Sequence, residues 1–263
     1  GQQSPLRFAL TMFSLAVICL SLLAPAGAQE ASMDRSALSA PKSSAVESSW
    51  VENLGQWREG IDFVYTRGGL RAWVGDEALW LERRALVGED SLELRSHALR
   101  LSIEGGALKD PLGSSPVGGQ RSYLKGSESS AWVHGVRGWS ELTCREVLTG
   151  VDLVLRPEEG SFAYDLYLAP GVREAEVVMH VEGAKSLRLD RDGSLLIGTP
   201  MGDLRQRAPV AWELTPRGRR VPVKSRFLLL GKDRFGFVVE RRNSRRALVI
   251  DPGFEWGTYL GDT

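Results

Sequence analysis

The sequence is short of cysteine, with only Cys19 and Cys144 among its 263 residues. Cys19 falls inside a predicted export signal, so Cys144 would be the single cysteine of the processed chain. An intramolecular disulfide and a paired-cysteine zinc site are then both excluded. The fold is expected to depend on its hydrophobic core alone, in which Cys144 would be a small buried side chain.

The sequence also lacks an excess of charge of either sign. Its 33 basic and 33 acidic residues give a formal net charge of +0. A neutral chain has no global field to attract nucleic acid or anionic lipid, so we expect no nucleic-acid partner. Basic clusters at residues 217–224 and 241–246 are interpreted as solvated charges of turns and edge strands.

Motifs of catalysis and cofactor binding are missing as well. The three histidines, His97, His134 and His180, lie far apart and in no spacing typical of metal ligands. There is no G-x-S-x-G elbow, no Walker loop and no dinucleotide fingerprint. We therefore predict that the protein is not an enzyme, and we assign it no catalytic residue, no metal and no cofactor.

The apolar run Phe8–Leu23 is about 16 residues long, shorter than the ~20 that a membrane-spanning helix needs. Arg7 precedes it, and the small residues Ala-Pro-Ala-Gly-Ala follow at 24–28. This order is typical of a secretory signal. Residues 1–28 are therefore predicted to be a signal peptide with a helical apolar region, cleaved after Ala28. A membrane anchor, or a lipid anchor on Cys19, is the alternative. The protein is expected to be extracytoplasmic, secreted or on the cell surface, with no stable membrane span.

The chain from Trp50 onward contains no apolar stripe of helical period that lasts three turns. Residues 29–48 are rich in Ser and Ala and predict a flexible linker, whereas residues 49–255 predict a β-rich domain. Apolar residues there alternate with polar ones, and turn residues recur every 8–12 positions. The pattern predicts an all-β, antiparallel, sandwich-like fold.

The Gly- and Ser-rich stretch Asp110–Gly119 predicts a loop, with a possible division into two packed subdomains near 110–120. The clearest alternating segments are residues 63–74, 99–103, 151–155, 162–168 and 177–181.

Three aspartates lie among apolar residues: Asp152, Asp165 and Asp251. A bare carboxylate is too costly to bury, so each needs a partner or solvent. They could serve as the acid/base pair of a glycoside hydrolase or as oxygen ligands of Ca²⁺. The favoured interpretation is that they face the polar side of their strands, cap turns or pair with arginine. The segment 190–193, Asp-Arg-Asp-Gly, predicts a hairpin turn.

Several short segments occur in an order that resembles a known family. In this order and spacing they are similar to the N-terminal domain of unknown function that precedes SBBP (seven-bladed β-propeller) repeats in large secreted bacterial proteins. The resemblance covers about Trp50 to Thr263. The segments are Glu52-Asn53-Leu54-Gly55-Gln56-Trp57, Tyr123-Leu124-Lys125-Gly126 with Trp132, Gly150-Val151-Asp152-Leu153-Val154, Tyr164-Asp165-Leu166, Ala169-Pro170-Gly171, Gly183-Ala184, Leu187-Arg188-Leu189, Gly193-Ser194-Leu195, residues 204–210, Leu248-Val249-Ile250-Asp251-Pro252 and Thr258-Tyr259-Leu260-Gly261.

The sequence departs from the family's pattern at a few positions. Arg156 and Cys144 stand where the family usually has aromatic or apolar residues. Thr149 replaces a usual proline, and Asp262 replaces a second glycine of the repeat opening.

The resemblance implies a non-catalytic structural or interaction module of a secreted or cell-surface propeller-type protein. Residues 256–263 would be the start of a truncated propeller repeat, and the chain is expected to be a fragment. A downstream propeller domain or a cell-surface glycan is the expected partner. The alternatives are a carbohydrate- or calcium-binding module that uses aromatic residues or aspartates, and a glycan hydrolase with Asp152 and Asp165 as acid and base.

Overall fold

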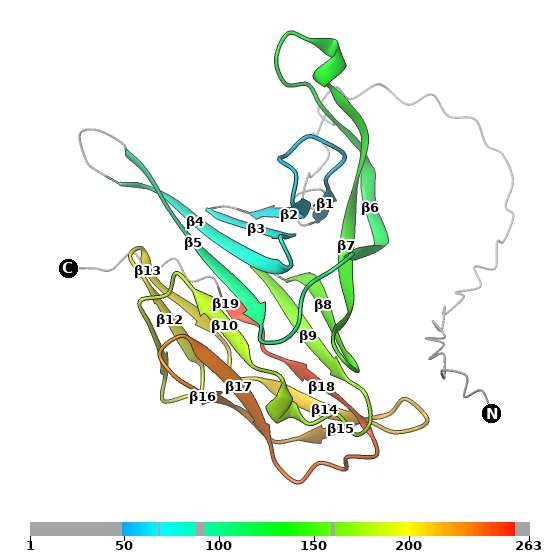
Figure 1. The fold of residues 1–263 in the computed structure, drawn as a ribbon, viewed down its shortest axis with the longest axis vertical. Helices are drawn as coiled ribbons and strands as arrows, with labels where there is room; N and C mark the ends of the chain where they lie inside the picture. The colour runs from blue at the N-terminus through cyan, green and yellow to red at the C-terminus, as the bar shows by residue number, and fades with distance from the viewer. Residues whose placement is uncertain (1–48, 68, 88–92, 159–160, 256–263) are drawn as a thin grey trace, which may run out of the picture. The chain divides into compact units, whose positions relative to one another are not determined.

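The computed structural model describes residues 49–67, 69–87, 93–158 and 161–255, all of which belong to one compact unit. The predicted signal peptide, the linker and the repeat opening lie outside the described residues. The regular secondary structure of the described chain is strand, apart from two short 3₁₀ helices at Ser129–Ala131 and Glu174–Glu176. None of its helices is long and apolar enough to cross a membrane. The predicted all-β class is confirmed (Figure 1).

The strands form in chain order with short connections. They are β1 (Trp50–Glu52), β2 (Ile61–Arg67), β3 (Leu70–Gly75), β4 (Ala78–Val87), β5 (Glu93–Ile103), β6 (Leu112–Tyr123), β7 (Val133–Leu148), β8 (Val151–Glu158), β9 (Ser161–Leu168), β10 (Met179–Glu182), β11 (Ser186–Leu189), β12 (Leu195–Thr199), β13 (Gly202–Gln206), β14 (Val210–Leu214), β15 (Arg220–Val223), β16 (Ser225–Leu229), β17 (Arg234–Val239), β18 (Ala247–Asp251) and β19 (Phe254–Glu255).

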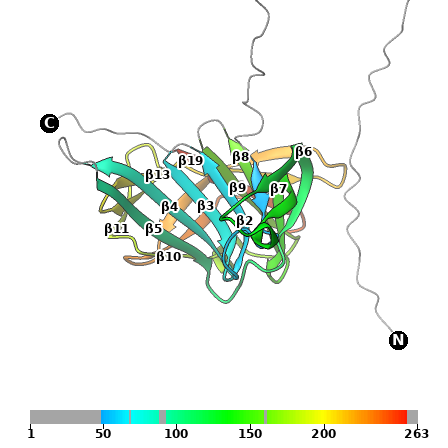
Figure 2. The same ribbon diagram turned by 90° about the horizontal axis from the view of Figure 1, so that it is seen from above.

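Two antiparallel sheets contain these strands. The large sheet has the order β15-β14-β18-β9-β8-β7-β1-β2-β3-β4-β5-β10-β17-β16, with β6 paired to β7, and the small sheet has the order β11-β12-β13-β19. The two edge strands of the large sheet, β15 and β16, are consecutive in the chain and are joined by Lys224 alone. The hydroxyl of Ser225 also donates to the carbonyl of Pro209, 2.6 Å away, just before β14. The large sheet therefore bends back on itself, as Figure 2 also shows, in the sandwich-like arrangement that was predicted.

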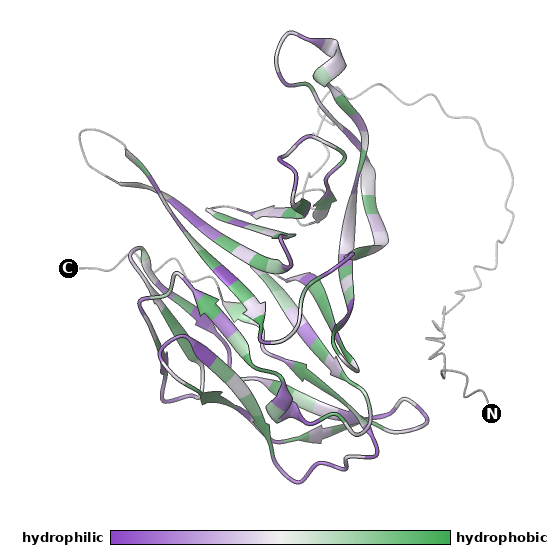
Figure 3. Ribbon diagram, viewed as in Figure 1, coloured by the Kyte–Doolittle hydropathy of each residue, from purple (hydrophilic) through white to green (hydrophobic). Residues whose placement is uncertain are grey.

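Alternation along the strands sorts side chains between the core and the outer face. On β5 the side chains of Leu99, Leu101 and Ile103 are buried, while Arg100 and Ser102 between them are partly exposed. Figure 3 shows the same change between hydrophobic and hydrophilic residues along the strand. Burial of each such leucine or isoleucine stabilises the fold by roughly 1.5–3 kcal/mol, so the period-two pattern fixes which face of β5 turns inward.

A chain of aromatic rings joins the two sheets inside one core. Trp50 and Tyr65 lie 5.4 Å apart between ring centroids, Trp50 and Phe162 lie 5.6 Å apart, and Phe162 contacts Phe254 of the small sheet at 5.2 Å. The Tyr65 hydroxyl donates to the carbonyl of Ser161 at 2.7 Å. Such tilted and edge-on pairs add about 0.5–1.5 kcal/mol each beyond their buried area, and they hold β1, β2, β9 and β19 together.

The loop expected over Asp110–Gly119 is wrong, because a strand, β6, begins at Leu112. It pairs with β7 through Leu112 opposite Thr143 and Val117 opposite Gly138. Most β6 side chains are exposed, so backbone hydrogen bonds rather than apolar burial hold this strand. Figure 1 shows β6 and β7 as a long paired ribbon. Residues on both sides of this segment share the same hydrophobic core.

The hairpin predicted at residues 190–193 is confirmed between β11 and β12. Gly193 has a φ of 85°, and the Asp190 amide donates to the Ser194 carbonyl at 2.8 Å. Both carboxylates of the turn, those of Asp190 and Asp192, pair with the guanidinium of Arg205 on β13. They are therefore engaged by a cation of the protein itself.

Candidate functional site

Two of the three candidate aspartates converge on one arginine. Arg156 of β8 donates from Nε to Asp165 Oδ2 at 3.2 Å and from Nη2 to Asp165 Oδ1 at 3.1 Å, which is a bidentate pair across the β8–β9 hairpin. The same Nη2 contacts Asp251 Oδ2 of β18 at 2.8 Å. The Asp165 side chain is only 8% exposed, so this guanidinium supplies the charge that a buried carboxylate requires.

Two further charges complete this cluster. Arg156 Nη1 donates to Glu158 Oε1 at 2.8 Å, and Arg207 donates to Glu158 Oε2 at 2.6 Å. Burial, and secondly the neighbouring carboxylate of Asp165, raise the pKa of Asp251 despite the attraction of Arg156. Three carboxylates and two guanidinium groups thus share one partly buried ion network.

Asp152 makes its hydrogen bond outside this ion network. Its Oδ1 accepts the backbone N–H of Glu146 at 2.7 Å. Glu146 has a φ of 48° and lies where the pairing of β7 with β8 shifts its register, between Cys144 and Leu148. Asp152 therefore stabilises a β-bulge, in which one amide would otherwise lack its strand partner.

The aspartates are poorly placed for the chemistry considered for them. A hydrolase needs one carboxyl that exchanges a proton with substrate and another that is open to the sugar, whereas Asp165 and Asp251 bind an arginine and Asp152 binds an amide. A calcium ion would have to displace the guanidinium of Arg156. No group of three or more His, Cys, Asp or Glu in the described part of the chain is arranged to hold a metal ion.

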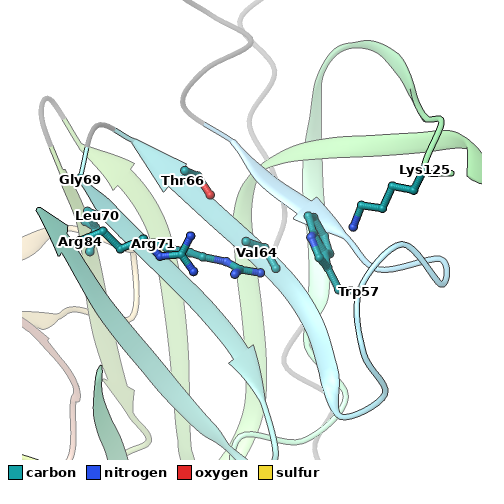
Figure 4. Close-up of a pocket in the computed structure, with 8 residues that line it drawn as sticks. All are labelled: Trp57, Val64, Thr66, Gly69, Leu70, Arg71, Arg84 and Lys125. Carbon is teal, nitrogen blue, oxygen red and sulfur yellow. The ribbon is translucent and has the colours of Figure 1, made fainter. Parts of the chain in front are cut away.

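A pocket of about 410 Å³ lies elsewhere, on the outer face of β2, β3 and β4 (Figure 4). This volume is within the range of small-molecule sites, about 300–1,000 Å³. Arg71 and Arg84 lie on one side of it, and Trp57 and Lys125 lie on the other. The remaining lining residues are Val64, Thr66, Gly69 and Leu70.

The wall that carries Trp57 is shaped by two amide side chains. Asn53 Oδ1 accepts the N–H groups of Gly55 and Trp57, both at 3.1 Å, and its Nδ2 donates to the carbonyl of Ile61 at 2.7 Å. Gln56 is buried, and its Oε1 accepts the Leu54 amide at 2.8 Å. These side-chain to backbone bonds fold residues 53–57 into a defined loop, so the Trp57 indole is held at the pocket.

The second wall comes from the connection after β6 and contacts the first. Lys125 Nζ donates to the Gln56 carbonyl at 2.8 Å, and the rings of Trp57 and Tyr123 meet edge to face at 5.6 Å. These residues belong to two of the segments named above, 52–57 and 123–126, which are about 70 positions apart in the chain. The fold brings both segments to the rim of one pocket.

The floor of the pocket holds two neighbouring arginines. Burial, and secondly the positive charge of Arg84, lower the pKa of Arg71. Arg84 pairs with Glu82 at 2.8 Å. Among the described residues Arg71 has no ion pair, and its guanidinium lies 5.6 Å from the centroid of the Trp73 ring. No sequence motif marks this pocket, because its cations come from three separate segments. The local signal in the sequence was that Arg71 and Trp73, two positions apart, both occupy the outward side of a strand.

The fold defines the chain as an all-β module of sandwich-like architecture. A family model matches residues 50–253, and the chain belongs to that family, which is described as a domain of unknown function (DUF7948). No curated protein and no solved structure matches it.

Proposed function

We propose that the chain is a non-catalytic interaction module of an exported bacterial protein in which SBBP-type propeller repeats follow the module. The signal-like pattern of residues 1–28 and the repeat-like segment Thr258-Tyr259-Leu260-Gly261 support this context. Membership of a family of unknown function is compatible with it. In this proposal the module binds a ligand on its surface and does not itself catalyse a reaction.

One observation carries the non-catalytic part of the proposal. Asp165 and Asp251 both pair with Arg156, and neither lines the described pocket. The described pocket, in contrast, is lined by three cations and no carboxylate. A site with cations and an indole but no carboxylate can bind and orient a ligand, and it lacks the pair of carboxyl groups that glycoside hydrolysis needs.

The proposal is tested by incubating the full chain with a panel of bacterial and plant polysaccharides and measuring new reducing ends. No product is expected above the level given by Asp165→Asn, which keeps the shape of the side chain and removes its charge. Turnover by the wild-type chain that Asp165→Asn abolishes would show a glycan hydrolase and would overturn the proposal.

A carbohydrate-binding module is the more specific form of the proposal, and Trp57 at the pocket favours it, because indole rings present a flat apolar surface with a polar edge. A calcium-binding module has less support. Asp190 and Asp192 pair with Arg205, and Asp165 and Asp251 pair with Arg156.

Export is tested separately by expressing the full chain in a Gram-negative host and sequencing the N-terminus of the periplasmic or secreted product. Cleavage after Ala28 is expected, so the processed chain would begin at Gln29. A product that keeps residues 1–28 and stays in the cytoplasm would contradict the extracytoplasmic part of the proposal.

A further inference from the structure

The pocket formed by Trp57, Val64, Thr66, Arg71, Arg84 and Lys125 is an unbalanced positive site in a chain with no net charge. Three cations line it, and one carboxylate, that of Glu82, pairs with Arg84, so the local formal charge is 3 − 1 = +2. Lys125 donates to a neutral carbonyl, and Arg71 has no carboxylate partner within hydrogen-bond distance among the described residues. A second negative charge in the pocket would therefore meet cations that the protein does not neutralise.

The scaffold holds the two arginines side by side against their mutual repulsion. Arg71 lies opposite Glu82 on β4, and Gly69 precedes β3 opposite Arg84, so the strand register fixes both backbones. The Trp73 ring, near the Arg71 guanidinium, stacks on Trp80 at 5.6 Å and an angle of 4°. A cation beside such a ring is attracted to its face. Arg71 is thus positioned before any ligand arrives, and an anion would counter both the burial and the repulsion from Arg84 that lower the pKa of Arg71.

The rest of the pocket is suited to a ligand that is only partly charged. Val64 adds a small apolar surface beside the arginines, Trp57 adds an indole, and Thr66 adds a hydroxyl. A free phosphate or sulfate ion would use the cations and leave this apolar surface wet. A sugar ring has an apolar C–H face that covers an indole and hydroxyl groups that bond to a threonine.

We propose that this pocket binds an anionic saccharide, in which a carboxylate or sulfate group on the sugar pairs with Arg71 and Arg84 while the ring packs against Trp57. The inference rests on the proposed interaction function and specifies its ligand class. A planar carboxylate fits the donor fork of a guanidinium through two parallel hydrogen bonds. Lys125 contributes as a point charge at the rim.

The test is isothermal titration calorimetry with the full chain and four probes: an oligosaccharide of galacturonic acid, the matching neutral galactose oligosaccharide, a sulfated galactose oligosaccharide and inorganic phosphate. Binding of at least one acidic oligosaccharide is expected, about tenfold or more tighter than the neutral one, and it should weaken as salt rises. Comparison of the carboxylated and the sulfated probe identifies the anionic group.

Variants assign the binding to the pocket. Arg71→Gln and Arg84→Gln should each weaken acidic-saccharide binding about tenfold or more, since each removes charge-assisted bonds. Trp57→Ala should weaken binding of the same probe, and Trp57→Phe should keep most of it. Arg217→Gln is the matched control, because it removes an exposed cation on the β14–β15 turn, and it should change nothing. Circular dichroism melting identifies any variant that fails to fold. If Arg84→Gln fails to fold, Arg84→Lys takes its place, because it keeps the charge and loses the forked donor geometry of the guanidinium.

Equal affinity for the acidic and neutral oligosaccharides, undiminished binding by Arg71→Gln, or phosphate binding as tight as that of either acidic saccharide would each overturn the inference. The absence of any saccharide binding would also overturn it, while the non-catalytic proposal would stand. Cleavage of the probe oligosaccharide during the titration would instead overturn the proposed function.

Discussion

Arg156 and Asp165 form a bidentate ion pair between neighbouring strands, with Nε to Oδ2 at 3.2 Å and Nη2 to Oδ1 at 3.1 Å. Arg156 also reaches Asp251 on β18, which pairs with β9 on its other side. One guanidinium therefore ties three adjacent strands. We expect this cation to be important for stability.

Replacement of Arg156 by leucine should destabilise the protein by about 3 kcal/mol, because it leaves the buried Asp165 carboxylate without its charge partner. The free energy of unfolding, from urea denaturation monitored by fluorescence, measures this change. Arg173→Gln is the matched control, since Arg173 and Glu176 form an ion pair whose side chains are 77% and 51% exposed. Its effect on the free energy of unfolding should be negligible, because solvent screens an exposed pair. An equal loss of unfolding free energy in both variants would show that the buried Arg156 pair contributes no more than an exposed ion pair.

Asp251 should make the protein more stable as the pH falls, which is the opposite of the usual effect of a paired carboxylate. Its pKa is higher in the folded chain than in the unfolded one, mainly through burial. The folded state therefore binds this proton more tightly, so the penalty for the charged group is present above the folded pKa and is lost as the pH falls through it. The difference in unfolding free energy between wild type and Asp251→Asn should shift in favour of wild type between pH 7 and pH 4.5. A shift in favour of Asp251→Asn would contradict the raised pKa.

Cys144 should be chemically inert while the protein is folded. Its side chain is fully buried on β7, and burial, with a smaller contribution from Asp62, raises the pKa of its thiol to about 12. At pH 8 only about 10⁻⁴ of the thiol would be ionised, and the thiolate is the reactive form. In a Cys19→Ser background, reaction with an aromatic disulfide reagent should be more than about a hundredfold slower in native buffer than in denaturant. Similar rates in the two solvents would contradict the buried position.

Asp152 should act through one oxygen atom. Asp152→Ala removes the acceptor of the Glu146 amide at the β-bulge and should cost about 1 kcal/mol of stability. Asp152→Asn keeps an oxygen that can accept the same N–H, so its cost should be clearly smaller. Chemical denaturation of both variants measures the difference. An asparagine variant as unstable as the alanine variant would indicate that the charge, and not the hydrogen bond, is what matters there.

Local patterns predicted the parts of the fold that depend on local chemistry. The alternation of Leu99, Leu101 and Ile103 identified the buried face of β5, because apolar burial selects one side of a strand. The segment 190–193 identified a hairpin, because Gly193 adopts the positive φ that the turn requires. Neither prediction needed any knowledge of the strand order.

The features that were missed depend on contacts between distant segments. β6 buries few side chains and is rich in Gly and Ser, so its pairing with β7 left no apolar pattern to detect. Pairing with arginine was one of the interpretations left open for Asp165, although nothing local indicated that Asp251 would share the same arginine. The pocket joins Trp57, Arg71 and Lys125 only after β6, β7, β1, β2 and β3 have paired in that order. No short window of sequence contains that arrangement.

Binding of an acidic saccharide at the pocket on β2, β3 and β4 is tested most directly by two-dimensional ¹H–¹⁵N NMR of the labelled chain during titration with a galacturonic acid oligosaccharide. The expected result is a shift of the Trp57 indole N–H, assigned with Trp57→Phe, and of the backbone amides around Thr66 and Arg71. The surroundings of Arg156 should stay unchanged, and the oligosaccharide should remain intact. Shifts centred on Arg156 and Asp165, or cleavage of the oligosaccharide, would contradict a non-catalytic module that binds its ligand at the cationic pocket.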